Sequence, residues 1–319
     1  MKNARFGIEI EFTGITREQA AQTAREYLGG TLRGNNVIAP DGRVWKFVYD
    51  GSITPQRKER GQRVEIDNDD YKVELVSPIL TYDADIETIQ ELVRRLRKAG
   101  AFTNSSAGIH IHLDGQPHTP RSIRNFINII ASKNDLFYKA LQIEPARMSY
   151  CKKMDTYLVE RMNRRRPQTM GHIQRIWYDG YEDAQTAHYH ASRYHFLNLH
   201  SFFHGNRTVE LRGFNAGKDG KLHAGVVRSY IILALALNNQ ALTQKSASSR
   251  KNQTENEKFA MRTYLNRIGF IGEEFKNCRE HLTAALDGEA AWRHGRDGEA
   301  CQRQREAIRL NRMEMGLMV

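Results

Sequence analysis

The sequence predicts an α+β fold built around a mainly antiparallel β-sheet. Short segments in which apolar and polar residues alternate recur along the chain, as they do in half-buried strands. Most are joined to the next by a tight turn or by a single helix that returns to the same sheet. From about residue 250 the chain is highly charged and helical in pattern, so a helical C-terminal region is expected.

The first strand is the segment 6–12, FGIEIEF, whose strict alternation places Glu9 and Glu11 on one face. A helix follows, because Thr16 and Gln19 form a capping-box pattern and two glycines end the segment. The next elements are expected to be strands at about 31–39, 44–49, 62–67 and 71–77, and a long amphipathic helix at about 83–99.

The second half of the chain continues the alternation of strands and helices. The expected elements are a strand at 107–114 (AGIHIHLD), a helix that opens at Thr119, strands at 193–203 (RYHFLNLHSFF) and 207–214 (RTVELRGF), and a helix at 221–243. The last of these helices is apolar, but Asn and Gln interrupt it. We therefore expect it to be buried in protein and not to cross a membrane.

The net charge of +11 suggests an anionic partner. The basic runs PQRKERGQR (55–63) and RMNRRRP (161–167) would suit phosphates, but aromatic residues do not alternate with them as a stacking platform requires. We interpret the runs as solvated surface or loop, with attraction of a nucleotide or an acidic substrate as the alternative. A nucleic-acid partner is the least favoured reading of the charge.

The cysteines predict a reduced protein. The chain has an odd number of cysteines, Cys151, Cys278 and Cys301, which lie far apart and form no CxxC pair. Neither a disulfide framework nor a structural zinc site is therefore expected. No apolar segment follows a basic start, so we expect a cytoplasmic protein. The histidine-rich segment 188–204 fits no standard zinc spacing, and core and surface histidines are the preferred interpretation. Oligomerisation is left open.

One face of four predicted strands carries ionisable side chains that a half-buried sheet does not need. They are Glu9 and Glu11, Glu74, His110 and His112, and Glu210 and Arg212. Glutamates with imidazoles and few thiols are suited to binding Mg²⁺ or Mn²⁺. An arginine beside such ligands would repel the metal, but its position is explained if a phosphate binds both the arginine and the metal. The set predicts a metal-nucleotide site on the concave face of the sheet, without a standard phosphate-binding loop.

Five motifs in this order resemble the amidoligase family, the carboxylate-amine ligases related to glutamine synthetase and glutamate-cysteine ligase. They are FGIEIEF, DGSI (50–53), VELVSP (73–78), AGIHIHLD and TVELRGF, within residues 1 to about 240. The resemblance implies ATP-dependent joining of a carboxylate to an amine through an acyl phosphate, with Mg²⁺ or Mn²⁺. It also implies a curved antiparallel sheet with helices on its outer face.

Carried onto this chain, the resemblance implies two groups of metal ligands. Glu9, His110 and Glu210 would surround the metal that bridges the ATP phosphates. Glu11 and Glu74 would hold the metal nearer the carboxylate substrate. The second group has two evident carboxylates, and it is completed either by water or by one of Glu65, Asp67 and Asp69.

The resemblance also implies roles for residues that contact substrates. His112 and Arg212 would contact the transferring phosphoryl group, where charge must be neutralised. Asp50 would draw a proton from the amine, although an Asp-Gly-Ser segment is also a common turn. Arg193 and Asn198 would touch the substrate or the nucleotide, with strand packing as the alternative.

The expected organisation is a catalytic domain at 1–245 and a helical extension at 246–319. The expected function is an ATP-dependent amidoligase that takes a carboxylate substrate, such as an amino acid, peptide or protein glutamyl group, and an amine. The first alternative is a phosphotransferase resembling a guanidino kinase, which would release a phosphorylated product. The second is a basic nucleic-acid-binding protein, argued from charge alone.

Overall fold

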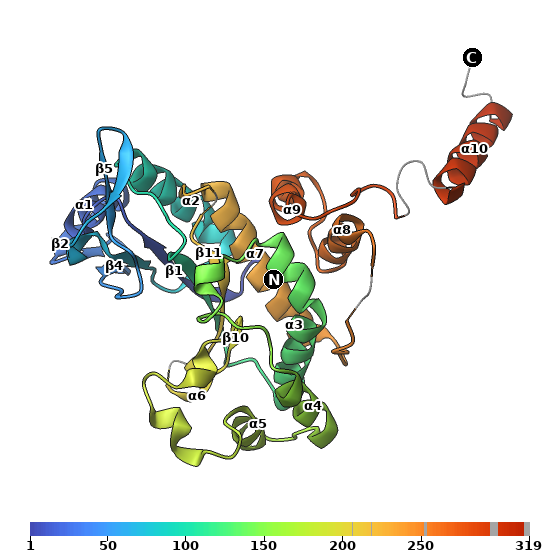
Figure 1. Cartoon of the computed structure of the whole chain (residues 1–319), viewed down its shortest axis with the longest axis horizontal. Coiled ribbons are helices and arrows are strands. Elements are labelled where there is room, and N and C mark those ends of the chain that lie inside the picture. Colours follow the sequence, from blue (N-terminus) through green and yellow to red (C-terminus); the bar gives the residue numbers. More distant parts are fainter. Residues whose placement is uncertain (206, 218, 252–253, 294–298, 316–319) are drawn as a thin grey trace. The chain divides into compact units, whose positions relative to one another are not determined.

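The computed structural model describes residues 1–205, 207–217, 219–251, 254–293 and 299–315. The chain forms two compact units, Met1–Lys251 and Asn252–Val319. The α-helices of the second unit are α8 (Glu257–Arg267), α9 (Lys276–Thr283) and α10 (Glu299–Glu314) (Figure 1). The predicted helical C-terminal region is therefore confirmed.

The first unit is organised by one sheet, in which the strand order is β10-β11-β9-β1-β7-β4-β3-β2 and β8 pairs with the start of β1. Every pair in this sheet, within the described part of the chain, is antiparallel, and the sheet is not closed into a barrel. The predicted α+β class is confirmed. The strands are β1 (Arg5–Phe12), β2 (Thr31–Arg33), β3 (Asn36–Ile38), β4 (Val44–Val48), β7 (Val73–Val76), β8 (Leu80–Thr81), β9 (Gly108–Asp114), β10 (Leu197–Asn198) and β11 (Thr208–Asn215).

The two faces of the sheet differ sharply in polarity. In the register of the central strands, Ile10 lies beside Ile109 on one neighbour and beside Leu75 on the other, and all three side chains are buried. Since successive residues of a strand point to opposite faces, Glu9 and Glu11 lie on the other face. The apolar face supplies the core and leaves the polar face available for a site.

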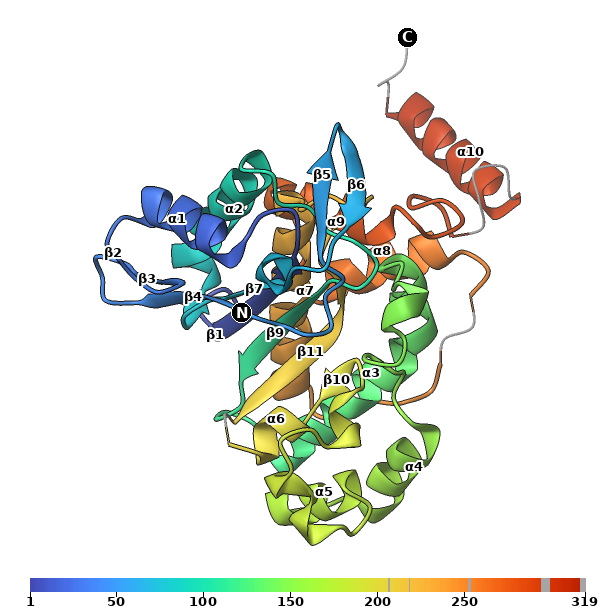
Figure 2. The same cartoon turned by 60° about the vertical axis from the view of Figure 1, so that its left-hand side comes forward.

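Helices cover the apolar face and flank the sheet (Figures 1 and 2). The central one is α7 (Ala224–Thr243), which contacts β9, α2 (Tyr82–Lys98) and α3 (Pro120–Ala140), while α1 (Arg17–Leu28) packs on β4. The predicted capping box of α1 is present, because Gln19 N donates to Thr16 Oγ1 and Thr16 N to Gln19 Oε1. None of the helices in the described ranges has the length and apolarity needed to cross a lipid bilayer.

The connection between β4 and β7 differs from the prediction. The expected strand at 62–67 is β6 (Gln62–Glu65), but it pairs with β5 (Gln56–Glu59) in a separate hairpin and not with β7. The alternation rule missed β5 because its side chains are all polar. The expected strand at 31–39 is likewise a hairpin, β2 and β3, with a turn at Gly34.

The expected strand at 193–203 is also mostly wrong. Only β10 is extended, and α6 (His200–Phe203) follows it directly. Asn198 Oδ1 accepts a hydrogen bond from His200 N at 2.7 Å, which ends the strand and starts the helical turn. Arg193 lies in a 3₁₀ turn, η4 (Ala191–Arg193), and not in a strand. Between α3 and this region lie α4 (Thr156–Arg165) and α5 (Met170–Trp177), which the sequence pattern did not predict.

Candidate functional site

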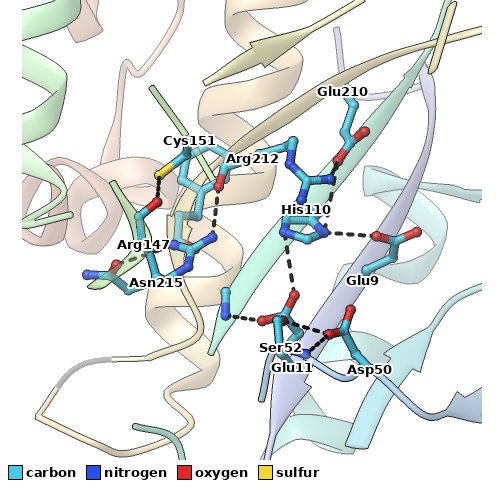
Figure 3. A network of polar contacts seen from close by, with 12 residues as sticks. Glu9, Glu11, Asp50, Ser52, His110, Arg147, Cys151, Glu210, Arg212 and Asn215 are labelled. Carbon is cyan, nitrogen blue, oxygen red and sulfur yellow. Dashed lines mark hydrogen bonds and ion pairs between the residues drawn. The ribbon is translucent and has the colours of Figure 1, made fainter. Parts of the chain in front are cut away.

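The central antiparallel strands bring the predicted metal ligands together. The register places Glu9 of β1 beside His110 of β9, and Glu11 of β1 beside Glu74 of β7. His110 lies between the two β1 carboxylates, with Nδ1 3.0 Å from Glu9 Oε2 and Nε2 3.5 Å from Glu11 Oε1 (Figure 3). His112 Nε2 lies 3.2 Å from Glu9 Oε1. Side chains from three strands therefore share one small polar cluster.

Strand β11 adds an ion pair to this cluster. Arg212 Nη1 donates to Glu210 Oε1 at 2.6 Å, and Asn198 Nδ2 donates to Glu210 Oε2 at 2.6 Å. Both members of the pair are buried, yet in the part of the chain that the structure describes Arg212 Nε has no hydrogen-bond partner. Asn198, for which contact with substrate or nucleotide and strand packing were the two expectations, is buried in β10 and orients Glu210 through this hydrogen bond. The register of β11 shifts between Leu211 and Phe214, and this irregularity follows the Glu-Leu-Arg segment directly.

Asp50 joins the carboxylates from the turn after β4. Its Oδ1 accepts hydrogen bonds from Ser52 N at 2.7 Å and Ser52 Oγ at 2.6 Å, which fixes the Asp-Gly-Ser turn. Ligand atoms of Glu11, Asp50 and Glu74 lie within 4.8 Å of one another. Asp50 therefore offers the third carboxylate that the sequence analysis sought elsewhere. The other residues considered for this third ligand are Glu65, Asp67 and Asp69. All three are exposed, and none of them belongs to a ligand group in the described chain.

The described chain holds two further groups of three possible ligand atoms, and they share Glu9. One group is Glu9, His112 and Glu210, and the other is Glu9, Glu74 and His110. All the groups lie on the polar face of the sheet. The histidine-rich segment forms none within the described residues; its His200, for example, contacts the Tyr178 hydroxyl and Ala187 O.

Crowding of like charges perturbs the titration of the cluster. Burial, reinforced by the charges of Glu9, Glu11 and Asp50, raises the pKa of Glu74 to about 10. Burial opposes the charging of His112, but the carboxylates of Glu9 and Glu210 outweigh it and raise its pKa to about 9. At neutral pH both groups therefore carry a proton. Protons on these two side chains relieve part of the repulsion among the carboxylates.

Burial also opposes ionisation of the two carboxyl groups that contact the imidazoles, but nearby cations outweigh it. His112 and His110 hold the pKa of Glu9 well below its ordinary value. Arg212, followed by the two histidines, lowers the pKa of Glu210. Glu9 and Glu210 therefore remain carboxylates at neutral pH, which is the state that a metal ligand requires.

A cavity lies on each side of the cluster. The first, about 400 Å³, lies at the start of β1 and is mainly apolar; its lining includes Gly7, Glu9, Val76, Ile79, His112 and Thr208. The second, about 310 Å³, lies at the end of β1 and is more polar; its lining includes Glu11, Asp50, His110, Arg147, Arg193 and Arg212. Since Glu9 and His112 face one cavity and Glu11 and His110 the other, the cluster separates two binding spaces.

Several residues of the site were missed by the sequence analysis. Thr208 Oγ1 lies 3.0 Å from His112 Nδ1, and its position two residues before Glu210 on the same strand face was a usable signal. Arg147 and the tyrosines that line the second cavity come from turns distant in the chain, and no pattern marked them. The tyrosines are Tyr49, Tyr150, Tyr189 and Tyr194.

Arg147 holds the irregular part of β11 in place. Its Nη2 donates to Arg212 O at 2.9 Å and its Nη1 to Phe214 O at 2.6 Å (Figure 3). The guanidinium lies against Gly108, where a Cβ would come within 2.1 Å of Arg147 Nη2. Arg147 therefore satisfies two buried carbonyls and, through the backbone, positions the side chain of Arg212.

Arg147→Met is expected to destabilise the first unit by about 3 kcal/mol, because two buried carbonyls would lose their donor. Chemical denaturation of the variant measures this. Arg33→Met, at an exposed position of β2, is the control and should change the free energy of unfolding by less than about 0.5 kcal/mol. Equal stability of the two variants would contradict the assigned role of Arg147.

One face of the antiparallel sheet thus gathers carboxylates, imidazoles and a buried arginine between two cavities, and these side chains could hold a divalent cation. Residues 2–238 match the model of the family described as "putative amidoligase enzyme", and the chain belongs to this family. The match covers the sheet, the polar cluster and both cavities. No curated protein matches the chain.

Proposed function

We propose that the protein is an ATP-dependent carboxylate-amine ligase that forms an amide bond through an acyl phosphate. The observation that carries the proposal is the convergence of Glu9, Glu74 and Glu210 with two imidazoles and Arg212 on one sheet face between two cavities. Membership of the amidoligase family supports a ligase-type reaction. Phosphoryl transfer depends mostly on positioning and on neutralised charge, which this set of groups can provide.

The donor set fits a divalent cation of the Mg²⁺ or Mn²⁺ type. Oxygen ligands predominate, and the ligand atoms of each group lie within 4.8 Å of one another. Burial and then the charges of nearby carboxylates raise the pKa of Glu74, and a bound cation would favour its ionised form. Glu11 and Glu74 would hold one ion and leave Asp50, which lies beside them, able to accept a proton. Glu9, His110 and Glu210 would hold the other, because His110 Nδ1 lies 3.0 Å from Glu9 Oε2 and 3.9 Å from Glu210 Oε1. A bound cation would supply charge that neutralises phosphate oxygens.

In the first step, an oxygen of the substrate carboxylate attacks the γ-phosphorus of ATP. The bond between that phosphorus and the β-γ bridging oxygen breaks, ADP leaves, and an acyl phosphate forms. Arg212 would donate its unpartnered Nε to the transferring phosphoryl group. Protonated His112 would donate a second hydrogen bond. The two cations would then stabilise the negative charge of the transferring group.

In the second step, the amine nitrogen attacks the acyl carbon, and the carbon–oxygen bond to phosphate breaks. Inorganic phosphate leaves and the amide remains. The amine must lose a proton, and Asp50 is the carboxylate proposed to receive it, because it lies in the cavity opposite the His112 side of the cluster. We assign the apolar first cavity to the adenosine of ATP and the polar second cavity to the other substrates.

Mass spectrometry of reactions with ATP, Mg²⁺ and pools of carboxylates and amines tests the proposal. A product with the summed mass of one carboxylate and one amine less water, formed with one ADP and one phosphate, is the expected result. A stable phosphorylated amine or guanidine would instead support the phosphotransferase. Salt-sensitive DNA binding without nucleotide turnover would support the nucleic-acid-binding alternative. Either of these results would overturn the ligase proposal.

The pKa shifts predict how pH affects the metal-free protein. Folded Glu74 has a pKa of about 10 against an ordinary 4.5, and folded His112 about 9 against 6.5. Both groups hold protons more tightly when folded, so the stability they contribute is lost as pH rises from about 4.5 to 10 for Glu74 and from about 6.5 to 9 for His112. The range from pH 7 to 10 covers the upper part of both losses. In EDTA, the unfolding temperature should fall by roughly 3 °C or more over this range.

The matched comparison is Glu74→Gln, which removes one of the two titrating groups and should show a smaller fall. Added Mg²⁺ should stabilise the wild-type chain more at pH 9 than at pH 6, because the ion competes with these protons. Differential scanning fluorimetry measures both effects. Identical pH profiles of the wild-type chain and Glu74→Gln would contradict the perturbed titration of Glu74.

A further inference from the structure

Arg193 lines the second cavity, and no carboxylate pairs with it among the side chains that the structure describes. Its guanidinium carbon lies 5.1 Å from the ring centroid of Tyr189 and 5.7 Å from that of Tyr194. Nη1 donates to His188 O at 3.3 Å, while Nε is buried and has no hydrogen-bond partner among the described residues. In the described part of the chain, no carboxylate oxygen lies within 4.0 Å of it. The guanidinium thus lies near two aromatic rings and has N–H donors left for a ligand.

The other two arginines of this cavity are engaged elsewhere. Arg147 donates to the backbone of β11. Arg212 pairs with Glu210 through Nη1, and we have assigned its Nε to the transferring phosphoryl group. A buried donor without a partner costs free energy, and a positioned guanidinium fits the two oxygens of a carboxylate. Arg193 therefore has the chemistry of an anion-recognition group, and the anion it lacks is expected to come from a ligand.

The same cavity also contains a carboxylate that can attract a cation. Asp50 lines the cavity, approaches Glu11 and Glu74, and is not among the ligands that we assign to the metal. A volume of about 310 Å³ is at the lower end of the range for small-molecule sites. A cavity that offers a guanidinium and a carboxylate in so small a space is complementary to a zwitterion.

We propose that the second cavity binds the amine substrate and that this substrate is a free amino acid. Its carboxylate pairs with Arg193, and its amino group lies toward Asp50, beside the acyl phosphate. The proposal rests on the proposed ligase function, since it assigns the amine of that reaction. The proposal also assigns Arg193 to contact with the substrate and not with the nucleotide. The reason is that Arg193 does not line the cavity that we assign to adenosine.

Binding to the 319-residue chain, loaded with Mg²⁺ and a non-hydrolysable ATP analogue, tests this inference. The probes are the twenty standard α-amino acids, each compared with the amine that lacks its α-carboxylate, by isothermal titration calorimetry. At least one amino acid should bind, and it should bind about 10- to 100-fold more tightly than its amine, as expected for a charge-assisted pair. Binding of none of them, or equal binding of acid and amine, would overturn the proposal.

Variants of Arg193 then link this preference to the side chain. Arg193→Met should reduce the affinity for the amino acid by about 10- to 100-fold and leave the affinity for the amine unchanged. Arg193→Lys should recover part of the loss, because it restores the charge without the planar fork. Arg175→Met, at an exposed position of α5, is the control and should bind as the wild-type chain does.

The ATP analogue distinguishes failure of this inference from failure of the proposed function. Arg193→Met should bind the Mg²⁺-loaded analogue with unchanged affinity and unfold at the same temperature as Arg175→Met. Weaker binding of the analogue would move Arg193 to the nucleotide site and overturn the proposal. Absence of analogue binding to the wild-type chain would instead refute the ATP dependence of the proposed function.

Discussion

Replacing either Glu9 or Glu210 by glutamine is expected to abolish turnover while the chain stays folded. Glutamine keeps the size of the side chain but loses its charge. Glu9 lies within 3.2 Å of both imidazoles, and Glu210 pairs with Arg212 at 2.6 Å. Loss of either carboxylate would weaken metal binding and remove charge stabilisation, at a cost on the order of 10³-fold in rate.

The rate of ADP release under saturating substrates measures this loss. Glu87→Gln is a matched control, because Glu87 is exposed on α2 and lies outside both cavities. The control should keep the wild-type rate. Circular dichroism and denaturation should show that Glu9→Gln is folded, since this change also reduces repulsion within the acidic cluster. Normal activity in either site variant would refute the metal assignment.

Replacing Arg212 by alanine is expected to slow acyl-phosphate formation by up to several orders of magnitude. Arginines that stabilise a transferring phosphoryl group contribute about 10³- to 10⁵-fold in related chemistry. The side chain is buried, its Nη1 is paired with Glu210, and its Nε has no partner within the described protein. That free donor is the group that we expect a phosphate oxygen to meet.

The alanine variant also leaves Glu210 buried without its ion pair, which costs about 3–5 kcal/mol. Arg212→Lys separates the two effects, because it retains a charge for Glu210 but not the planar set of donors. Single-turnover measurements should show a slowed chemical step in Arg212→Lys with a near-native unfolding temperature. Equal single-turnover rates for Arg212→Lys, Arg212→Ala and the wild-type chain would remove Arg212 from the site.

Much of the polar cluster could be predicted from the sequence, because strand periodicity is a local property. Alternation places Glu9 with Glu11, His110 with His112, and Glu210 with its arginine on single strand faces. An antiparallel sheet with one apolar face then aligns these polar faces, since a slip of one residue would bury the charges. The register observed in the sheet is the one this reasoning requires.

The walls of the second cavity could not be predicted in this way. Arg193 and Tyr189 lie in irregular backbone, where no period relates sequence position to side-chain direction. Arg147 follows a helix, and its structural role depends on its hydrogen bonds to two carbonyl oxygens of β11. That contact is not visible in the local sequence. The β5 strand was missed because polar exposed strands lack the alternation on which the assignment depends.

Transfer of ¹⁸O from the substrate carboxylate to phosphate tests the central claim most directly. The measurement uses the carboxylate and amine that the mass-spectrometric screen identifies, with both carboxylate oxygens labelled. Because the attacking oxygen stays on phosphorus when the carbon–oxygen bond breaks, the account predicts one ¹⁸O in each phosphate released and one in each amide. Unlabelled phosphate, formed while the amide accumulates, would contradict the acyl-phosphate route.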